Sequence, residues 1–539
     1  MVEHVLPLEV PLVEAQAAED LLVVEDNLDI QKFIKKAMKI IYTFMFFGLT
    51  VFTIKAQETT INDALRLAVD NITGTARYRS MSGAFGAVGG DLSSINQNPA
   101  GSIFFNNNLA TGSISYFGVR NKSNYFGTQT TENDNSLDLN QAGVVFVFNE
   151  TSKSTDWNKI SLAFNYENTN NFNNTIFSAG TNPYNSIGNY FLDFAQGIPL
   201  DYLKNINFNQ LYFNEQQAYL GYDTYIFEPF TNASDNVDYY TNIPTGGNYY
   251  QENYTNTNGY NGKLTANFAT SYKNKLFLGA NLNVHFVDIQ KVFNIYESNN
   301  NPVYDEGSTI GSIFFRNELF TFGSGISFNL GAIYQPIDNI RVGVAYESPT
   351  WYRLTDQLTQ GVVTTSINNQ DNNSRPSSFQ DTQEFLPYYI QTPSKWTGSL
   401  AYIFGKRGLI SADVSMKDYS VTRFKPKNSQ PYTSLNTTMD SILDNAMEVR
   451  LGGEYKIKQF AIRGGYRFEQ SPYKIDQAFG DLTGYSGGIG YTFGENRIDL
   501  AYTHEYRNMN QAFLSSGMTD MARINRKNNT VTVSYTINF

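Results

Sequence analysis

Apolar and polar residues alternate along most of the chain in segments of strand length, from Leu109 to the C-terminal Phe539. In the last segment, valine, tyrosine, isoleucine and phenylalanine occupy the odd-numbered positions from 531 to 539, and threonine, serine and asparagine occupy the even-numbered ones. Successive side chains of a strand point to opposite faces, so each segment predicts a strand with one apolar and one polar face. We expect about fourteen such strands, at residues 109–120, 140–149, 158–168, 261–272, 275–290, 321–335, 340–349, 394–404, 408–418, 447–456, 459–469, 483–493, 496–507 and 529–539.

The connections between these segments alternate between tight turns and long polar stretches. The tight turns include residues 273–274, 336–339, 405–407, 457–458 and 494–495. The long connections are residues 121–139, 169–260, 291–320, 350–393, 419–446, 470–482 and 508–528. Short turns at one end, long loops at the other and an even number of strands are typical of single-chain outer-membrane barrels. We therefore predict an all-β fold, in which residues 109–539 form a transmembrane antiparallel β-barrel.

The two faces of these strands have different predicted surroundings. Open sheet edges cannot remain unpaired in hydrocarbon, which favours a closed barrel over an open sheet. The apolar faces are expected to contact outer-membrane lipid, and the polar faces are expected to line the lumen. A terminal aromatic such as Phe539 resembles the signal by which bacterial barrels are recognised for assembly, so the barrel-assembly machinery is an expected partner.

Residues 1–37 differ from the rest of the chain. The run Leu21 to Ile30, L-L-V-V-E-D-N-L-D-I, resembles the first strand and acidic loop of a response-regulator receiver domain. In that family Glu25 and Asp26 would help to hold Mg²⁺. No later receiver strand with a phospho-acceptor aspartate follows in the sequence. We interpret residues 1–37 as a spurious or receiver-like N-terminal extension.

Residues 38–56 have the pattern of a secretory signal peptide. Lysines at positions 35, 36 and 39 precede an almost wholly apolar run from Ile40 to Ile54. This run has about 15 residues, fewer than the roughly 20 that a spanning helix needs. We expect cleavage after Ala56, although Ile54 is not the small residue usual two positions before it. The alternative is an uncleaved signal anchor.

Residues 57–108 combine a helical pattern with a glycine-dense stretch. Apolar residues at helical spacing between Ile61 and Ala68 predict a short amphipathic helix over residues 58–70. The stretch from Arg79 to Gly101 then contains five glycines and ends in a turn signal, Asn98-Pro99-Ala100-Gly101. Pro99 fixes its own φ and disfavours a helical Asn98. Composition alone leaves open whether this stretch is a compact plug or an ordinary linker.

A glycine-rich run that ends in Asn-Pro-Ala-Gly ahead of a β-rich chain resembles the N-terminal hatch of FadL-type long-chain fatty acid transporters. These are outer-membrane barrels whose hatch plugs the lumen. Phe328 to Thr350 closely resembles a hairpin of that family, and Glu448 to Tyr466 and Gly487 to Tyr502 resemble later hairpins more loosely. The resemblance implies a mostly helical hatch at residues 57–108 inside the barrel. It does not extend to residues 169–260, so the substrate stays open.

Composition excludes several classes of function. The formal net charge of −11 argues against nucleic acid, which needs clustered positive charge. The absence of cysteine excludes disulfides, thiolate metal sites and a cysteine nucleophile. His285 lies on a polar strand face and His504 near a strand end, and neither has a nucleophile motif nearby. We expect no enzyme activity, no cofactor and no metal. An outer-membrane enzyme would need a serine or an acidic group within hydrogen-bond reach of one of these histidines.

Strand parity directs a set of charged side chains into the lumen. The candidates are Arg341, Glu347, Arg450, Glu454, Arg463 and Arg467, together with Asp413, Lys417, Glu448 and Asp499. One interpretation is a network of opposite charges that fills the interior and anchors the plug. The other is that one or two arginines hold an anionic headgroup, such as a carboxylate.

The Asn-rich connection after the third strand contains an apolar group in helix-compatible stretches. Its members are Phe191, Phe194, Ile198, Leu200 and Phe213, with Tyr202 and Tyr219 nearby. An exposed apolar patch would mark an entrance for a hydrophobic ligand. The alternative is a private core of the loop.

The function expected from these features is passive uptake of hydrophobic small molecules such as long-chain fatty acids, through a monomeric outer-membrane channel gated by its hatch. The alternative is a structural or adhesive barrel whose loops bind partners. That alternative predicts a lumen packed by salt bridges with no apolar path.

Overall fold

The computed structural model describes residues 61–149, 156–368, 374–427, 432–475 and 478–539. They belong to one compact unit, residues 55–539. The predicted N-terminal extension and signal peptide lie outside the described residues. None of the described helices is long and apolar enough to cross a membrane.

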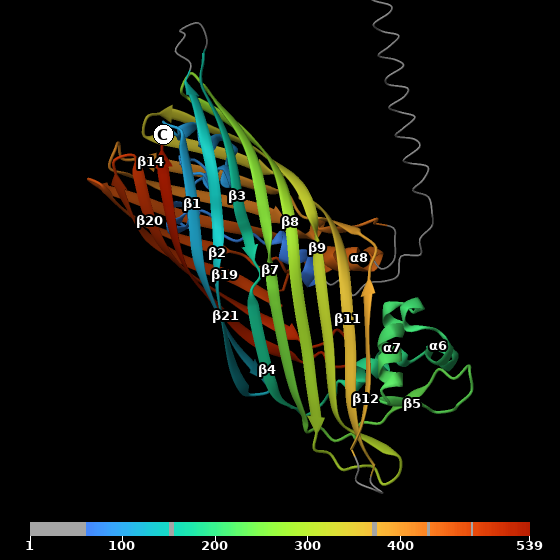
Figure 1. Cartoon of the computed structure of the whole chain (residues 1–539). Helices are drawn as coiled ribbons and strands as arrows, with labels where there is room; N and C mark the ends of the chain where they lie inside the picture. Colours follow the sequence, from blue (N-terminus) through green and yellow to red (C-terminus); the bar gives the residue numbers. More distant parts are fainter. Residues whose placement is uncertain (1–60, 150–155, 369–373, 428–431, 476–477) are drawn as a thin grey trace, which may run out of the picture. The chain divides into compact units, whose positions relative to one another are not determined.

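Fourteen of the described strands form a closed antiparallel barrel (Figure 1). In order around the wall they are β1 (Leu109–Tyr125), β2 (Thr128–Asn149), β3 (Trp157–Asn171), β7 (Tyr249–Tyr272), β8 (Leu276–Asn299), β9 (Ser308–Ile337), β10 (Ile340–Glu347), β14 (Lys395–Ile403), β15 (Gly408–Asp418), β17 (Asn445–Ile457), β18 (Phe460–Glu469), β19 (Phe479–Phe493), β20 (Asn496–Ala512) and β21 (Met521–Asn538). Each pairs with the next, and β21 pairs with β1, from Leu109↔Asn538 to Asn124↔Arg523. The predicted fold class is confirmed.

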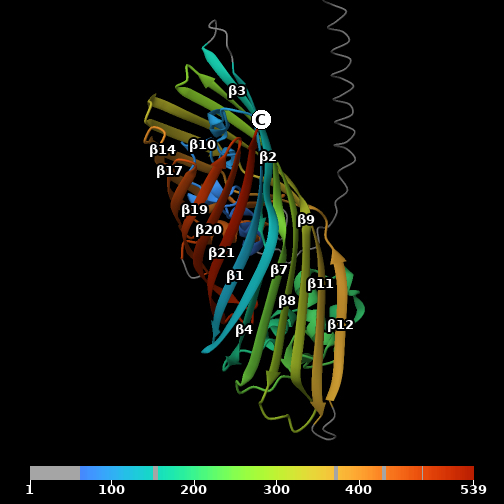
Figure 2. The same ribbon diagram turned by 60° about the vertical axis from the view of Figure 1, so that its left-hand side comes forward.

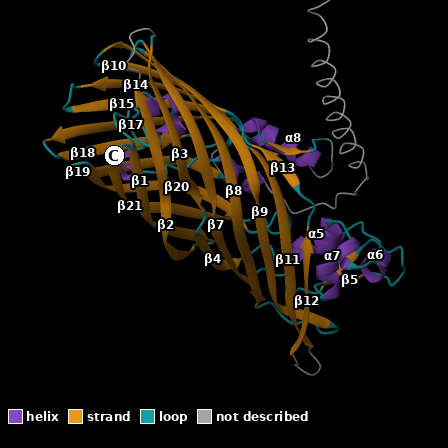
Figure 3. Cartoon of the chain, turned by 45° about the horizontal axis from the view of Figure 1, so that its top comes forward, coloured by secondary structure: helices purple, strands orange, loops and turns teal. Residues whose placement is uncertain are grey.

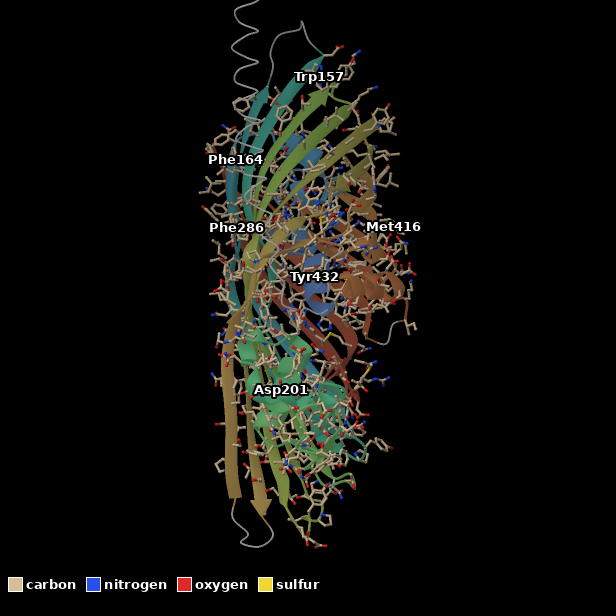
Figure 4. All side chains as sticks on the ribbon, turned by 90° about the vertical axis from the view of Figure 1, so that its right-hand side faces the viewer. Trp157, Phe164, Asp201, Phe286, Met416 and Tyr432 are labelled. Atoms are coloured by element: carbon tan, nitrogen blue, oxygen red, sulfur yellow. The ribbon has the colours of Figure 1, made fainter. Side chains whose placement is uncertain are left out.

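Alternating side chains give the wall its two faces, as the pattern predicted. On β21 the side chain of Val533 is 43% exposed, whereas its neighbour Ser534 is 1% exposed. Large apolar side chains also face outward on the other wall strands, and Figure 4 shows Phe164, Phe286 and Met416 on the outside of the barrel. A continuous apolar outer band is the surface that lipid requires.

The long connections are not loops throughout, which corrects the predicted strand ends. Residues 121–139, predicted as a polar loop, continue β1 and β2 to a tight turn at Phe126-Gly127. β9 alone has 30 residues, about three times the roughly 10 that a tilted strand needs to cross a bilayer. In the hairpin around Phe126-Gly127 most residues on both strand faces are polar. The alternation therefore disappears from the sequence there, although backbone pairing continues.

The other long connections contain additional short elements. The connection after β3 contains β4 (Asn174–Asn182), α5 (Gly188–Ala195), α6 (Leu200–Asn205), η2 (Phe208–Gln210), α7 (Phe213–Asp223), β5 (Phe227–Pro229) and β6 (Tyr239–Thr241). Those after β10 and β15 contain β11 (Trp351–Asn368), β12 (Ser374–Glu384), β13 (Tyr388–Gln391), η3 (Tyr419–Val421), β16 (Arg423–Lys425) and α8 (Tyr432–Ile442). Figure 2 shows β11 and β12 continuing the wall beside β9, and Figure 3 shows the helices α5 to α7 beside them.

The N-terminal segment crosses the lumen, and we call residues 61–108 the plug. It contains α2 (Ile61–Ala68), α3 (Ala76–Ser80), α4 (Ser94–Gln97) and η1 (Pro99–Phe104). α2 lies within the predicted helix 58–70, whose first residues are outside the described part. α3 contacts strands β18 to β21, and η1 contacts β3, β7, β8 and β9. The plug therefore reaches opposite arcs of the wall (blue in Figure 1).

Candidate functional site

Asn98 joins the plug to the wall at the start of η1. Its side-chain oxygen accepts from the amide of Ala100 at 3.1 Å, and Pro99 follows as the first residue of the turn. Asparagine before proline is a favourable helix start, because the cap satisfies an amide and proline has none to satisfy. The Asn98 amide donates to the carbonyls of Gly86 within the plug (2.8 Å) and Ala332 in the wall (3.2 Å). The predicted hatch motif is thus a buried contact between plug and wall.

Three wall glycines receive this motif, and we call them the glycine patch: Gly279 on β8, Gly331 on β9 and Gly343 on β10. A Cβ at Gly331 would lie 2.1 Å from Asn98 Oδ1, and one at Gly279 would lie 2.4 Å from the amide nitrogen of Ala100. Gly279 and Gly331 are direct cross-strand partners. Only glycine permits this close approach of two backbones. Two of the three glycines lie in the hairpin 328–350, whose sequence resembles the family. Close contact with the plug is a physical reason for glycine at these positions of the hairpin.

A second set of wall glycines lies under the end of α3. A Cβ at Gly465 would lie 2.4 Å from the carbonyl carbon of Met81, and one at Gly488 would lie 2.6 Å from Cβ of Ser80. These glycines lie in the two hairpins with the looser resemblance. Sequence reasoning did not identify them as contacts, although glycine in a strand interior is itself a sign of close approach.

Glu454 is the centre of one group of buried charges. Arg77 of the plug donates to both of its carboxylate oxygens, at 2.9 and 3.2 Å. Arg463 on the neighbouring strand donates to the same carboxylate at 2.6 Å and also to Asp499 at 2.8 Å. The carboxylates of Glu454, Asp91 and Asp499 hold the pKa of Arg77 above its usual range, although burial by itself lowers it. The plug and the wall are therefore joined here by a desolvated ion network.

A second group has Glu448 at its centre. Arg450 donates to both of its oxygens at 2.8 Å, and Arg467 donates to one of them at 2.6 Å. Arg450 also contacts the plug, donating to the Tyr78 hydroxyl at 3.2 Å. Arg467 donates to the plug carbonyl of Asp70 at 2.9 Å. Each of these two arginines thus joins the wall to the plug.

The remaining predicted lumen candidates, Arg341 and Glu347, also lie beside plug residues or their partners. Arg341 donates to the carbonyl of Val88 at 2.8 Å, and its guanidinium lies 3.8 Å from the ring centre of Phe104. Glu347 forms an ion pair with Lys395 at 3.0 Å. These contacts support the interpretation of the lumen charges as a network that fills the interior and anchors the plug. Sequence reasoning missed the plug's own members Asp70, Arg77 and Arg79, although charges within a small-residue stretch were a visible signal.

The two histidines in the described part of the chain have polar partners, and neither has an acidic one. His285 Nε2 lies 2.9 Å from Ser327 Oγ, and its Nδ1 lies 3.4 Å from the hydroxyl of Tyr352. His504 Nδ1 lies 2.8 Å from the side-chain oxygen of Asn529. The serine that the enzyme alternative requires is thus present beside His285. The carboxylate that would orient the ring is absent among the described residues, where tyrosine occupies its place.

An interior cavity of about 90 Å³ separates the plug from part of the wall. The plug contributes nine residues to its lining, among them Leu67, Ala68 and Asp70, and residues of the wall strands and their connections surround them. The wall side chains are mainly polar or charged: Glu167, Thr169, Asn170, Asn261, Lys263, His285, Glu347, Thr350, Thr392, Lys395, Lys417 and Arg450. A polar cavity of this volume holds several waters. In the described part of the chain, no group of three or more His, Cys, Asp or Glu residues is placed to hold a metal ion.

An apolar cluster lies against α2, and we call it the α2 cluster. Ala64, Leu65, Leu67 and Ala68 of the plug are buried there. Their partners come from the inner wall and the long connections: Phe172, Val287, Ile289, Tyr352, Leu354, Tyr388, Ile390, Tyr419, Phe424, Tyr432, Met439, Leu443 and Ala446. The α8 residue Tyr432 is labelled in Figure 4. An apolar zone inside a barrel is unusual, because lumen faces of such barrels are polar.

The apolar group of the loop after β4 forms a core rather than an open patch. Phe191 and Leu200 are fully buried, and Ile198 is nearly so. Phe194 and Phe213 are partly buried, with ring centres 6.3 Å apart. Phe191, Phe194, Ile198 and Leu200 pack together with residues of α7 and of the long strands, whereas Phe213 contacts this group through the ring of Phe194. The polar surface of this domain includes Asp201, which Figure 4 labels. The private-core interpretation accounts for these contacts.

Comparisons with known proteins match the C-terminal part of the chain to a family. The sequence model described as "Outer membrane protein transport protein (OMPP1/FadL/TodX)" matches residues 315–539. No curated protein matches the chain. The matched family consists of transport proteins rather than enzymes, and together with the closed barrel it places the chain in the outer membrane.

Several solved structures are similar to the chain. A FadL homologue of Pseudomonas aeruginosa is 14% identical with a TM-score of 0.49, over 88% of this chain and 100% of that one. The toluene transporter TodX of Pseudomonas putida is 15% identical with a TM-score of 0.45, over 88% and 100%. The toluene transporter TbuX of Ralstonia pickettii is 13% identical with a TM-score of 0.46, over 87% and 99%.

All three hairpins that carried the resemblance, at residues 328–350, 448–466 and 487–502, lie within the matched region. Residues 315–539 thus match the model of the OMPP1/FadL/TodX family of outer-membrane transport proteins, the family that those hairpins predicted.

Proposed function

We propose that the protein is a monomeric outer-membrane channel for passive uptake of hydrophobic small molecules, such as long-chain fatty acids. Residues 57–108 act as its hatch and residues 109–539 as its barrel. The transport family of the C-terminal region supports this function. A hydrophobic ligand gains roughly 25 cal/mol for each Å² of apolar surface that leaves water, so a concentration gradient is sufficient to drive entry.

The observation that carries the proposal is the α2 cluster. Inward-facing Val287 and Ile289 of β8, with Leu354 of β11, belong to the same buried cluster as Leu65 of the plug. Displacement of the plug would therefore uncover an apolar section of the inner wall. Such a surface binds a hydrophobic ligand but contributes nothing to an adhesive barrel.

A break in the pairing of the wall supports a sideways exit of the ligand through the wall. β2 pairs with β3 only through residues 141–149, and residues 128–140 pair with β1 alone. β4 resumes the chain at Asn174 and pairs with β7. In place of a backbone ladder, Asp134 of β2 accepts from the backbone amide and the hydroxyl of Thr175. Side-chain bonds of this kind separate at lower cost than a continuous ladder.

A specific observation also favours the structural or adhesive alternative. The charged groups around Glu454 and Glu448 form the salt-bridged lumen that this alternative predicts. They are concentrated on β17 to β20, whereas the α2 cluster lies along β8, β11 and the connections. The lumen therefore has one side on which ion pairs hold the plug and one apolar side. Because the adhesive alternative predicts no apolar path, we favour the channel.

Uptake of a labelled long-chain fatty acid by cells that produce the protein tests this function. We expect uptake above that of empty cells. The double variant Val287→Thr, Ile289→Thr makes the inner wall more polar, and is expected to lower the initial rate by about fivefold or more. The control Val342→Thr makes the same change on the outward face. Uptake no higher than in empty cells, with the barrel assembled at the surface, would favour the adhesive alternative.

A further inference from the structure

Asp70 of the plug lies between two lysines of the wall. Its carboxylate oxygens are 2.8 Å from Lys395 Nζ on β14 and 2.8 Å from Lys417 Nζ on β15. The two lysines are direct cross-strand partners, so both ammonium groups lie at the same level of the lumen. The side chain of Asp70 is 29% exposed, and the interior cavity lies beside it. Burial by itself raises the pKa of Asp70, but the two lysines lower it well below its usual range, so the group is a carboxylate.

The two lysines differ in which of their partners would remain if the plug moved away. Lys395 would keep the wall carboxylate Glu347, which lies 3.0 Å from it. Lys417 has two polar partners at 2.8 Å, the carboxylate of Asp70 and the carbonyl of Ala68, and both belong to the plug. Among the described residues no wall carboxylate forms an ion pair with Lys417.

Three charged groups of the wall near Asp70 already have partners. Arg450 and Glu448 pair with each other, and Arg467 pairs with Glu448 and donates to the carbonyl of Asp70. Removal of the plug would therefore leave the Lys417 ammonium, 10% exposed in the closed protein, without an anion in the barrel lumen. An unpaired buried charge is strongly unfavourable. The plug segment around Asp70 can therefore leave Lys417 at low cost only if another anion takes the place of Asp70.

The surroundings define the chemistry of that anion. The cavity beside Asp70 has room for a carboxylate headgroup and its waters. Leu67, Ala68 and Tyr352 line the cavity and are also members of the α2 cluster. A molecule with its headgroup at Lys417 would thus place an apolar tail at the α2 cluster. This arrangement fits a carboxylic acid with a long apolar tail.

We propose that Lys417, with Lys395, forms a carboxylate-exchange latch, in which the carboxylate of an amphipathic acid displaces Asp70 and releases the plug. The inference rests on the proposed channel function and names its ligand class. In the closed protein Asp70 takes the position of the ligand's own headgroup. An equally long alcohol lacks the anion and leaves the latch closed.

Accessibility of the plug tests the latch without transport. The chain has no cysteine, so Leu67→Cys in the buried α2 is a unique thiol for labelling in the purified, detergent-solubilised protein. We expect oleate to raise the labelling rate about tenfold over oleyl alcohol, as a coupling free energy of the usual size would give. With Lys417→Met added, acid and alcohol should act equally. Lys417→Arg should restore the preference, and the exposed-turn control Lys275→Met should keep it.

The possible results separate the latch from the channel. Equal labelling with oleate and oleyl alcohol in the Leu67→Cys protein overturns the latch, and so does an acid preference that persists in Lys417→Met. If cells take up both compounds at equal rates, the channel stands and the latch is wrong. If labelling is selective for the acid but cells take up neither compound, the latch stands and the uptake function is wrong.

Discussion

Replacing Gly279 with alanine is expected to open the channel by displacing the plug. The new Cβ would lie 2.4 Å from both the amide nitrogen of Ala100 and the carbonyl carbon of Pro99. These are backbone atoms, so no rotamer change relieves the clash, and overpacking of this kind costs about 1–3 kcal/mol. The cost falls on the closed state alone, which corresponds to a rise in the open population of about 5- to 150-fold. The open probability in single-channel recordings in planar bilayers measures that population directly.

The matched control for this experiment is Gly398→Ala. Gly398 lies on β14, and no atom lies within 4 Å of a Cβ added there. It carries the same change of residue in a wall strand without a contact to the plug. An assembled Gly279→Ala barrel with the same open probability as Gly398→Ala would contradict the role of the glycine patch in holding the plug.

Glu454→Gln is expected to be the most destabilising single change in the lumen. It leaves Arg77 of the plug without its carboxylate, and Arg463 with only Asp499. Breaking a buried ion pair by removing one partner costs about 3–5 kcal/mol, because the other charge stays desolvated. Urea unfolding of the protein refolded into lipid vesicles should show this loss. Glu495→Gln, in the exposed turn between β19 and β20, should unfold like the unchanged protein, and equal midpoints for the two variants would disprove the Glu454 network.

The membrane part of the fold was predictable from sequence because every second side chain of a membrane strand faces lipid and must be apolar. The strand predicted at residues 408–418 has the same bounds as β15, and both of its ends lie next to turns. Outside the lipid that demand ends. The hairpin around Phe126-Gly127 has polar residues on both faces, so its sequence could not be distinguished from a loop.

The sequence predicted which charged side chains point into the lumen, but not which residues they contact there. Parity alone directs Arg450, Arg463 and Arg467 inward, because strand geometry is local. Their partners on the plug are distant in sequence and follow only from how the plug crosses the lumen, as the contact of Arg77 with Glu454 illustrates. The same limit applies to the loop after β4. Helical spacing indicated that Phe191 and Phe213 share an apolar group, but only tertiary packing decides whether that group is a core or an open surface.

Reversible tethering of the plug tests the central claim, that a ligand passes only when the plug moves. The hydroxyl oxygens of Ser102 in the plug and Ser161 in β3 are 2.7 Å apart, so the double variant Ser102→Cys, Ser161→Cys places two thiols within reach of a disulfide. Uptake of labelled oleate is then measured before and after reduction, with each single variant as control. We expect the oxidised double variant to take up no more than empty cells, and reduction to restore uptake to the rate of the single variants. Equal uptake by the oxidised and reduced protein would contradict gating by the plug.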